Sequence, residues 1–187
     1  MKGFNTMTIK SSKRFFNGAL LAGALAMISA ESAVAQPAPG TAASPVRLVQ
    51  TWDKTFPRSD KVDHQKDAYD GVDRVIFMYP THWFNLTPNL KSYLNEVWSY
   101  GWAFGPEGHA LKNKEMMVVT SAGAAEQMYS ADGLIKSSMA DVLAPMKASA
   151  LYVGMKYLQP LVIYNAVNVS PERMNHLSSE LVSHLSA

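Results

Sequence analysis

The stretch VIFMY, at Val75–Tyr79, is a continuous apolar run that decides the expected fold. Two similar runs follow it, MMVVT at Met116–Thr120 and LVIYN at Leu161–Asn165. None of them alternates between polar and apolar residues, which is typical of strands covered on both faces of a parallel sheet. A fourth candidate, Val46–Thr51, does alternate, and we interpret it as an edge strand that is less fully buried.

Helical patterns separate these runs. The first helix is expected to begin at Thr87-Pro88, because Thr is a favourable N-cap and Pro is favoured at the first helical position. It is expected to end at Gly101. A second apolar stripe of helical period covers Met139–Val153, and a third helix is expected to open at Ser170. Parallel strands need crossover helices between them, so this order predicts an open three-layer α/β sheet.

The composition narrows the classes of protein that the chain can belong to. Its 187 residues are 48% hydrophobic and include no cysteine, which suits one globular domain and excludes a disulfide scaffold, a thiolate metal site and a cysteine nucleophile. The 17 basic residues exceed the 15 acidic ones only because of the N-terminal residues 1–35. This segment has four basic residues (Lys2, Lys10, Lys13 and Arg14) and one acidic residue, Glu31. The rest of the chain is nearly neutral, so no nucleic-acid partner is expected.

The N-terminal residues 1–35 have the order of a secretory signal peptide. A basic region precedes the apolar run FFNGALLAGALAMISA, and Ala33-Val34-Ala35 forms a cleavage-like site. The segment around Lys13-Arg14 resembles the twin-arginine export motif, with Lys in place of the first Arg. Because of this departure, both twin-arginine export and ordinary Sec export remain open. Residues 36–45, QPAPGTAASP, are predicted to be a linker, which leaves residues 46–187 as the folded domain. The expected location is periplasmic or secreted, or cytoplasmic if residues 1–35 are not a working signal.

Two unusual segments follow the predicted strands at the sheet edge where ligands of open α/β folds bind. After Tyr79 comes PTHWFNLT, a proline-containing turn with two adjacent large aromatic residues. After Thr120 comes SAGAAEQMY, whose small residues let backbone N–H groups approach a flat ligand before the Tyr129 hydroxyl. Together these loops suit a planar heteroaromatic ring; the alternative is that Trp83 and Phe84 simply cover the end of the sheet.

The segments MYPTHWFNLTPNLKSYLNEVWSYGWAFGPEG, VVTSAGAAEQMYS and DVLAPMKASALYVGMKYLQPLVIYNA resemble the flavodoxin-like NAD(P)H:quinone oxidoreductases. This family includes the ancillary oxidoreductases of glutathione-gated potassium-efflux systems, and the resemblance covers roughly residues 46–185. It implies a flavodoxin-like three-layer sandwich that binds FMN or FAD without a covalent bond. It also implies that NAD(P)H reduces the flavin and that a quinone-like substrate then takes the electrons.

The resemblance also assigns roles to individual residues. The loops expected to lie along the flavin ring are Pro80, Thr81, His82, Trp83 and Phe84, and then Thr120, Ser121, Ala122 and Gly123. Tyr129 matches the tyrosine on the substrate side, and His82 is the second candidate for a catalytic role. The histidine that usually follows this tyrosine is absent from the sequence. Trp102 and Phe104 match aromatic residues that complete the pocket across a homodimer interface.

One part of the family pattern is not visible in the sequence. Val46–Thr51 resembles the second strand of the family, and residues 1–45 offer no first strand and helix to hold a flavin phosphate. Three interpretations remain open. The chain is a diverged enzyme with Val46–Thr51 moved toward the sheet centre, or a non-catalytic binding or regulatory module that has lost phosphate binding, or a protein in which Gly18–Ala30 serves as the first helix.

Other kinds of chemistry have little support in the sequence. The five histidines are scattered, and the acidic stretch at residues 60–73 lacks a calcium-loop pattern, so no metal is expected. No serine lies in a G-x-S-x-G elbow, which argues against a hydrolase. If the chain is exported, no membrane partner is expected, because the efflux partners of its relatives act from the cytoplasmic side.

Overall fold

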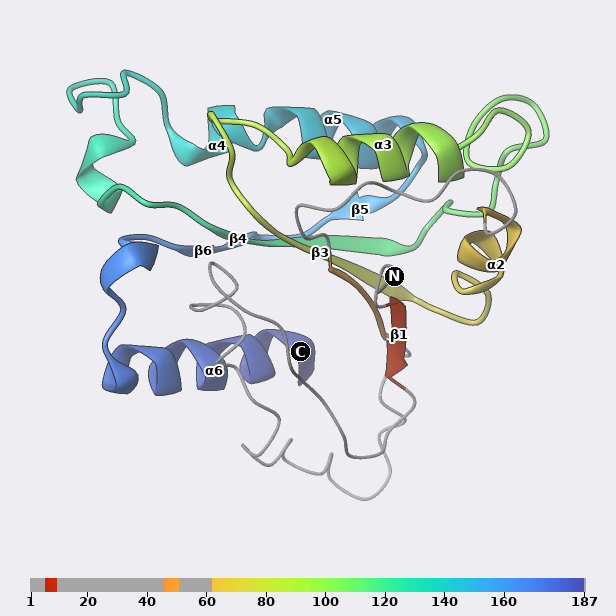
Figure 1. Ribbon diagram of the computed structural model, residues 1–187. Coiled ribbons are helices and arrows are strands. Elements are labelled where there is room, and N and C mark those ends of the chain that lie inside the picture. The colour runs from red at the N-terminus through yellow and green to blue at the C-terminus, as the bar shows by residue number, and fades with distance from the viewer. Residues whose placement is uncertain (1–5, 10–45, 51–61, 187) are drawn as a thin grey trace.

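The computed structural model describes residues 6–9, 46–50 and 62–186, and these form an α/β sheet with helices on both faces (Figure 1). The strands are β1 (Thr6–Ile9), β2 (Val46–Gln50), β3 (Arg74–Pro80), β4 (Glu115–Ser121), β5 (Lys156–Tyr157) and β6 (Leu161–Ile163). The strand order is β1-β2-β3-β4-β5, and β6 also pairs with β4. Only the β1–β2 pair is antiparallel among these. The predicted parallel sheet is therefore confirmed.

The central residues of β3 and β4, Val75–Tyr79 and Met116–Val119, are apolar because both faces of these strands are covered. Phe77 and Tyr79 belong to one buried cluster, which includes residues of the helices α3 (Pro88–Val97), α4 (Met139–Val142) and α5 (Ala144–Tyr152). Ile76 belongs to a second cluster with Leu177 and Leu181 of α6 (Pro171–Ser186), on the opposite face of the sheet (Figure 1). Successive side chains of a strand point to opposite faces, so a strand between two helical layers has no polar face.

The remaining elements are short. They are α2 (Val62–Asp67), the 3₁₀ turn η1 (Glu126–Met128) after β4 and the 3₁₀ turn η2 (Ala166–Asn168) after β6. No helix within the described ranges is both long enough and apolar enough to cross a bilayer.

The predicted helix start at Thr87 is confirmed, whereas two predicted boundaries are wrong. The Thr87 hydroxyl accepts a hydrogen bond from the Leu90 N–H, and α3 then ends at Val97, before Gly101. The expected single helix over Met139–Val153 is divided at Leu143, because Pro145 has no N–H to continue the hydrogen-bond ladder.

The N-terminal strands correct another prediction. Val46–Thr51 is not an edge strand, because β2 pairs with β1 on one side and with β3 on the other. In the usual flavodoxin-like order 2-1-3-4-5 the first strand lies beside the third, and Val46–Gln50 occupies that place here. Residues 10–45 and 51–61 lie outside the described residues. The signal peptide, the linker and the missing strand–helix unit therefore stay predictions, although Thr6–Ile9 of the signal-like segment forms β1.

Candidate functional site

The two loops singled out in the sequence meet at the carboxyl ends of β3 and β4. The Thr81 N–H donates to the Ser121 carbonyl at 2.9 Å, which extends the ladder by one bond beyond the strands. The Thr120 hydroxyl donates to the Tyr79 carbonyl at 2.8 Å and lies 2.9 Å from the Thr81 hydroxyl. Because the hydrogen of Thr120 is used in the first bond, Thr81 is the donor in the second. These bonds hold both loops in a defined register.

The first loop contains a tight two-residue turn. The His82 N–H donates to the Asn85 carbonyl at 3.1 Å, and the Asn85 N–H donates to the His82 carbonyl at 2.9 Å. Between them, Trp83 and Phe84 have φ values of 45° and 60°. Positive φ at both central residues is characteristic of a type I′ turn, which normally has Asn-Gly at these positions.

Two bulky aromatic residues in this backbone conformation need an explanation. The left-handed region costs roughly 1–2 kcal/mol for each non-glycine residue. Phe84 is 46% exposed and its ring contacts Tyr129, whereas Trp83 is 93% exposed and gains little burial in return. Strain at Trp83 that its side-chain contacts do not offset is typical of a functional site. The alternative that Trp83 only covers the end of the sheet does not fit its exposure.

Both loops also offer backbone donors. In the described part of the chain, the N–H groups of Trp83, Phe84, Gly123 and Ala124 make no hydrogen bond, whereas the Ala122 N–H donates to the Ile163 carbonyl at 2.9 Å. Unpaired donors on two neighbouring loops suit the carbonyl and nitrogen acceptors at the polar edges of a planar heterocycle.

A cavity of about 370 Å³, which we call the inner cavity, lies between the two loops. Its walls include Thr81, Trp83 and Phe84 on one side and Tyr129, Leu134 and Ile135 on the other. The Phe84 and Tyr129 rings are in edge contact, with centroids 6.4 Å apart. Its size is at the lower end for small-molecule sites, and its lining is mostly apolar, as such sites usually are.

Tyr129 continues into a row of aromatic rings. Its centroid is 5.6 Å from that of Tyr164, which follows β6. Partial burial raises the pKa of Tyr129, and burial together with the nearby Glu126 carboxylate raises the pKa of Tyr164. Both phenols are therefore protonated near neutral pH, so Tyr129 faces the inner cavity as a hydrogen-bond donor.

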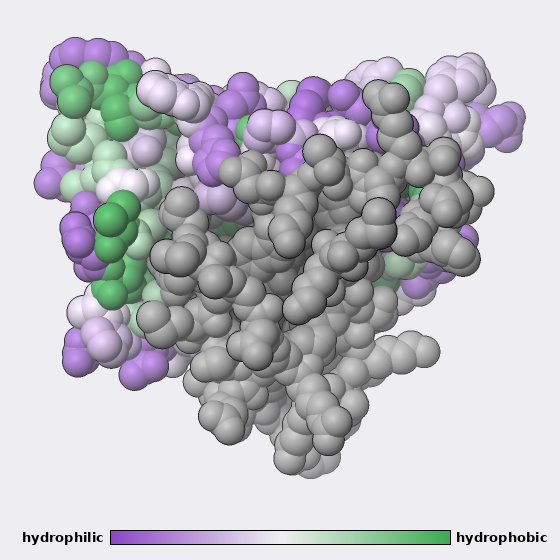
Figure 2. Space-filling view, in the orientation of Figure 1, coloured by the Kyte–Doolittle hydropathy of each residue, from purple (hydrophilic) through white to green (hydrophobic). Residues whose placement is uncertain are grey.

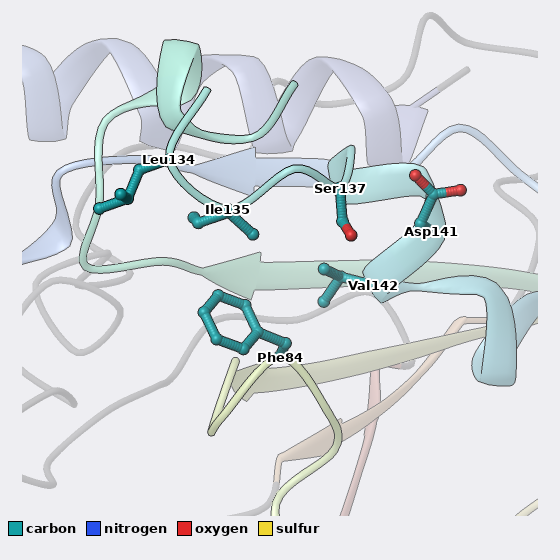
Figure 3. Close-up of a pocket in the computed structure, with 6 residues that line it drawn as sticks. All are labelled: Phe84, Leu134, Ile135, Ser137, Asp141 and Val142. Carbon is teal, nitrogen blue, oxygen red and sulfur yellow. The ribbon is translucent and has the colours of Figure 1, made fainter. Parts of the chain in front are cut away.

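A second cavity of about 520 Å³, which we call the outer cavity, adjoins the inner one and shares three of its residues. It is lined by Phe84, Leu134, Ile135, Ser137, Asp141 and Val142 (Figure 3). Figure 3 shows the Phe84 ring on one side and the segment after β4 together with α4 on the other. In Figure 2 hydrophobic surface is visible over the same segment after β4 and near η2.

The structure divides the predicted site residues into two groups. Thr81, Trp83, Phe84 and Tyr129 come together around the inner cavity. The others have different positions: Thr120, Ser121 and Ala122 are buried in or beside the sheet, Gly123 is exposed, Pro80 ends β3, and His82 lines neither cavity. The backbone of His82 closes the turn.

Several residues at the site were not predicted from the sequence, among them Leu134, Ile135 and Tyr164. Leu134 and Ile135 line both cavities, and Leu134 is 78% exposed. Two adjacent apolar residues inside the polar segment SADGLIKSS were a usable signal. Tyr164 lies at the end of a predicted strand, but its contact with Tyr129 depends on how the loops fold and has no signal in the sequence.

The described residues fit the ring of a flavin. The unpaired N–H groups of Trp83, Phe84, Gly123 and Ala124 match its polar edges, and the aromatic side chains match its faces. A flavin phosphate would need donors such as a helix N-terminus. The segments at residues 10–45 and 51–61, on either side of β2, lie outside the described residues, so the phosphate site stays a prediction. Within the described ranges no group of three His, Asp or Glu residues has metal-ligand geometry.

The chain is similar to several curated proteins. It is 37% identical to general stress protein 14 of Bacillus subtilis over 66% of this chain and 71% of that protein. It is 36% identical to the uncharacterized NAD(P)H oxidoreductase YdeQ of the same organism, over 66% of this chain and 63% of that protein. Ancillary proteins of glutathione-regulated potassium-efflux systems also match, at 30–34% identity.

Solved structures give the same fold. A general stress protein 14 from Treponema denticola in complex with FMN is 30% identical, with a TM-score of 0.59 over 66% of this chain and 72% of that one. A structure described as a thermophilic tryptophan halogenase from Streptomycin violaceusniger is 32% identical, with a TM-score of 0.66 over 69% and 75% of the two chains.

A family profile described as "Flavodoxin-like fold" matches residues 12–185, nearly the whole chain. The match begins upstream of Val46, the predicted start of the domain. With the parallel sheet, the two carboxyl-edge loops and the curated relatives, this match shows that the chain belongs to the flavodoxin-like family that includes NAD(P)H oxidoreductases and the potassium-efflux ancillary proteins.

Proposed function

We propose that this protein is an FMN-dependent NAD(P)H oxidoreductase that reduces quinones or similar electrophiles. The observation that carries the proposal is the strained, exposed Trp83-Phe84 turn beside the inner cavity and opposite Tyr129. Support comes from a relative named as an NAD(P)H oxidoreductase and from a structural neighbour at 30% identity that contains FMN.

The roles of the protein residues follow from their positions. The Phe84 and Trp83 rings would hold the flavin ring, and the unpaired N–H groups of Gly123 and Ala124 would donate hydrogen bonds to its acceptors. When bound, a flavin accepts a hydride from reduced nicotinamide and passes two electrons to an acceptor. Tyr129, protonated near neutral pH, donates a hydrogen bond to an oxygen of the quinone, where negative charge develops during reduction. Overall, the quinone would gain the hydride of NAD(P)H and one proton from solvent, which together convert it to the hydroquinone.

The test uses the purified full chain. After incubation with FMN or FAD and gel filtration, we expect a yellow protein that oxidises NADH or NADPH only when a quinone is present. A colourless protein that does not quench flavin fluorescence would contradict the proposal. That outcome would favour the alternative, a non-catalytic module of flavodoxin-like fold.

We further propose that the protein is a homodimer. An aromatic patch, made of the exposed Tyr100, Leu151 and Tyr152 with the partly buried Phe104 between them, lies where α3 and α5 end. The Phe104 ring contacts Tyr100 at 5.8 Å and Tyr152 at 5.7 Å between centroids. Contiguous apolar patches of this kind usually mark protein–protein interfaces. Trp102 instead packs inward, edge-on against Tyr69 at 5.4 Å.

The cellular location is also a proposal. The order of charge and hydrophobicity in residues 1–35 supports export to the periplasm or beyond. Fractionation of cells that express the C-terminally tagged chain tests it. We expect a shortened product beginning at Gln36 outside the cytoplasm, and a full-length cytoplasmic product would contradict export.

A further inference from the structure

We propose that the outer cavity is a second substrate subsite, which binds an uncharged apolar substituent of an acceptor whose ring occupies the inner cavity. This inference rests on the proposed function, because it extends the same site. It names the class of acceptor: quinones that carry a neutral hydrocarbon chain or an additional apolar ring.

The inner and outer cavities are continuous. Phe84, Leu134 and Ile135 line both of them, so the two spaces adjoin along one apolar wall. The inner cavity of about 370 Å³ is small for a flavin ring and a large acceptor together, whereas the outer cavity adds about 520 Å³. An acceptor with its ring next to the flavin would therefore direct a substituent past Phe84.

The lining of the outer cavity is mostly hydrocarbon. Phe84, Leu134, Ile135 and Val142 present hydrocarbon, and Leu134 is largely exposed when nothing covers it (Figure 3). An exposed leucine beside an exposed aromatic ring is stabilised by any apolar group that excludes water from both. A hydrocarbon chain provides this without needing a hydrogen bond.

The outer cavity also carries one negative charge. Asp141 is the only charged residue among the six that line the outer cavity. Its carboxylate accepts hydrogen bonds from the Ser138 hydroxyl at 2.7 Å and from the Ser138 N–H at 2.8 Å. These bonds lower the pKa of Asp141, so the wall is negative at neutral pH. An acceptor with an acidic side chain would be repelled by this carboxylate, which disfavours anionic substituents, and the hydrocarbon lining favours uncharged ones.

The experiment compares three acceptors with the FMN-loaded full chain: 1,4-naphthoquinone without a side chain, with a hexyl chain and with a carboxypentyl chain. We expect the hexyl compound to have a KM at least about tenfold lower than the parent, because each buried methylene strengthens binding roughly threefold to fourfold. The carboxypentyl compound should gain little. Direct binding, measured by quenching of tryptophan fluorescence, gives a readout that needs no turnover.

Two variants place the effect in the outer cavity. Ser137→Phe fills the space and should remove the advantage of the hexyl chain, whereas Ser179→Phe, at an exposed position on α6, should keep it. Asp141→Asn should improve binding of the carboxypentyl compound. Asp132→Asn is its matched control, because it removes an exposed carboxylate outside the lining.

The outcomes separate the two proposals. Equal KM and equal quenching for the parent and hexyl compounds would overturn the subsite and leave the proposed function standing. An advantage of the hexyl compound that survives in Ser137→Phe would overturn its location. If no quinone is turned over, the proposed function fails and the outer cavity is no substrate subsite; tighter binding of the hexyl compound that Ser137→Phe removes would then show only that the cavity binds hydrocarbon.

Discussion

At the scale of single residues, Trp83 is the most informative position. Its side chain is 93% exposed, so its removal leaves the core unchanged. We expect Trp83→Ala to weaken FMN binding about tenfold, since an aromatic stacking contact contributes roughly 0.5–1.5 kcal/mol beyond the area that it buries. Fluorescence titration of FMN measures the effect. Trp83→Phe, which keeps a ring, should retain most of the affinity, and an unchanged affinity in Trp83→Ala would refute the placement of this loop.

Two tyrosines with buried hydroxyl groups give a second residue-scale prediction. Tyr79 and Tyr157 each have a buried hydroxyl without a hydrogen-bond partner in the described structure. A buried unsatisfied polar group costs roughly 1–3 kcal/mol. Tyr79→Phe removes one such group and keeps the ring, so we expect the free energy of unfolding to rise by about 1 kcal/mol in urea denaturation. A fall would show that the hydroxyl has a partner, such as a buried water.

The same pair predicts how stability depends on pH. Burial raises the pKa of Tyr157 from 10.0 to about 12. The pKa of Tyr79 is also raised, mainly by burial and to a smaller extent by the nearby Tyr157. The unfolded chain loses these protons first, so their contribution is complete below pH 10 and disappears as the pH rises from 10 toward 12. Urea unfolding at pH 8, 10 and 11 should show a smaller loss in Tyr157→Phe than in the wild type; parallel curves would contradict this.

At the scale of one element, the His82–Asn85 turn should show a conflict between stability and binding. Replacing Trp83 with Asn and Phe84 with Gly supplies the residues that a type I′ turn favours. We expect this double variant to be more stable by about 2 kcal/mol, because the strain of two left-handed positions is relieved. It should also lose FMN binding. Thermal unfolding and flavin titration test both parts, and a loss of stability would mean that the aromatic side chains hold the turn.

At the scale of the whole molecule, the aromatic patch predicts the oligomeric state. Tyr152 is 74% exposed and contacts Phe104, so Tyr152→Asp places a charge within the patch. We expect light scattering after size exclusion to give a dimer for the wild type and a monomer for this variant. Ser179→Asp, an exposed position on α6, is the control and should remain dimeric. A monomeric wild type at micromolar concentration would contradict the dimer proposal.

The sequence alone determined the layers of the fold and half of the site. The runs at Val75–Tyr79 and Met116–Thr120 correctly predicted β3 and β4. A strand covered on both faces is a continuous apolar run, which is easily recognised in a sequence. The start of the helix after Thr87 could also be predicted from the sequence, because an N-cap residue and a proline affect only the adjacent helical turn. Trp83, Phe84 and Tyr129 were found because they follow such strands at the edge where ligands bind.

Only the tertiary structure decided how distant segments pair. The alternation in Val46–Gln50 says nothing about which strands lie beside it, and the place between β1 and β3 depends on contacts with segments far along the chain. The strain in the Trp83-Phe84 turn was invisible because it arises from the closure of His82 onto Asn85. The outer cavity likewise exists only because Leu134, Ile135 and α4 fold back toward Phe84. The hydrophobic periodicity of a segment indicates which of its faces is buried. Which other segment covers that face depends on long-range packing, and so only the tertiary structure shows it.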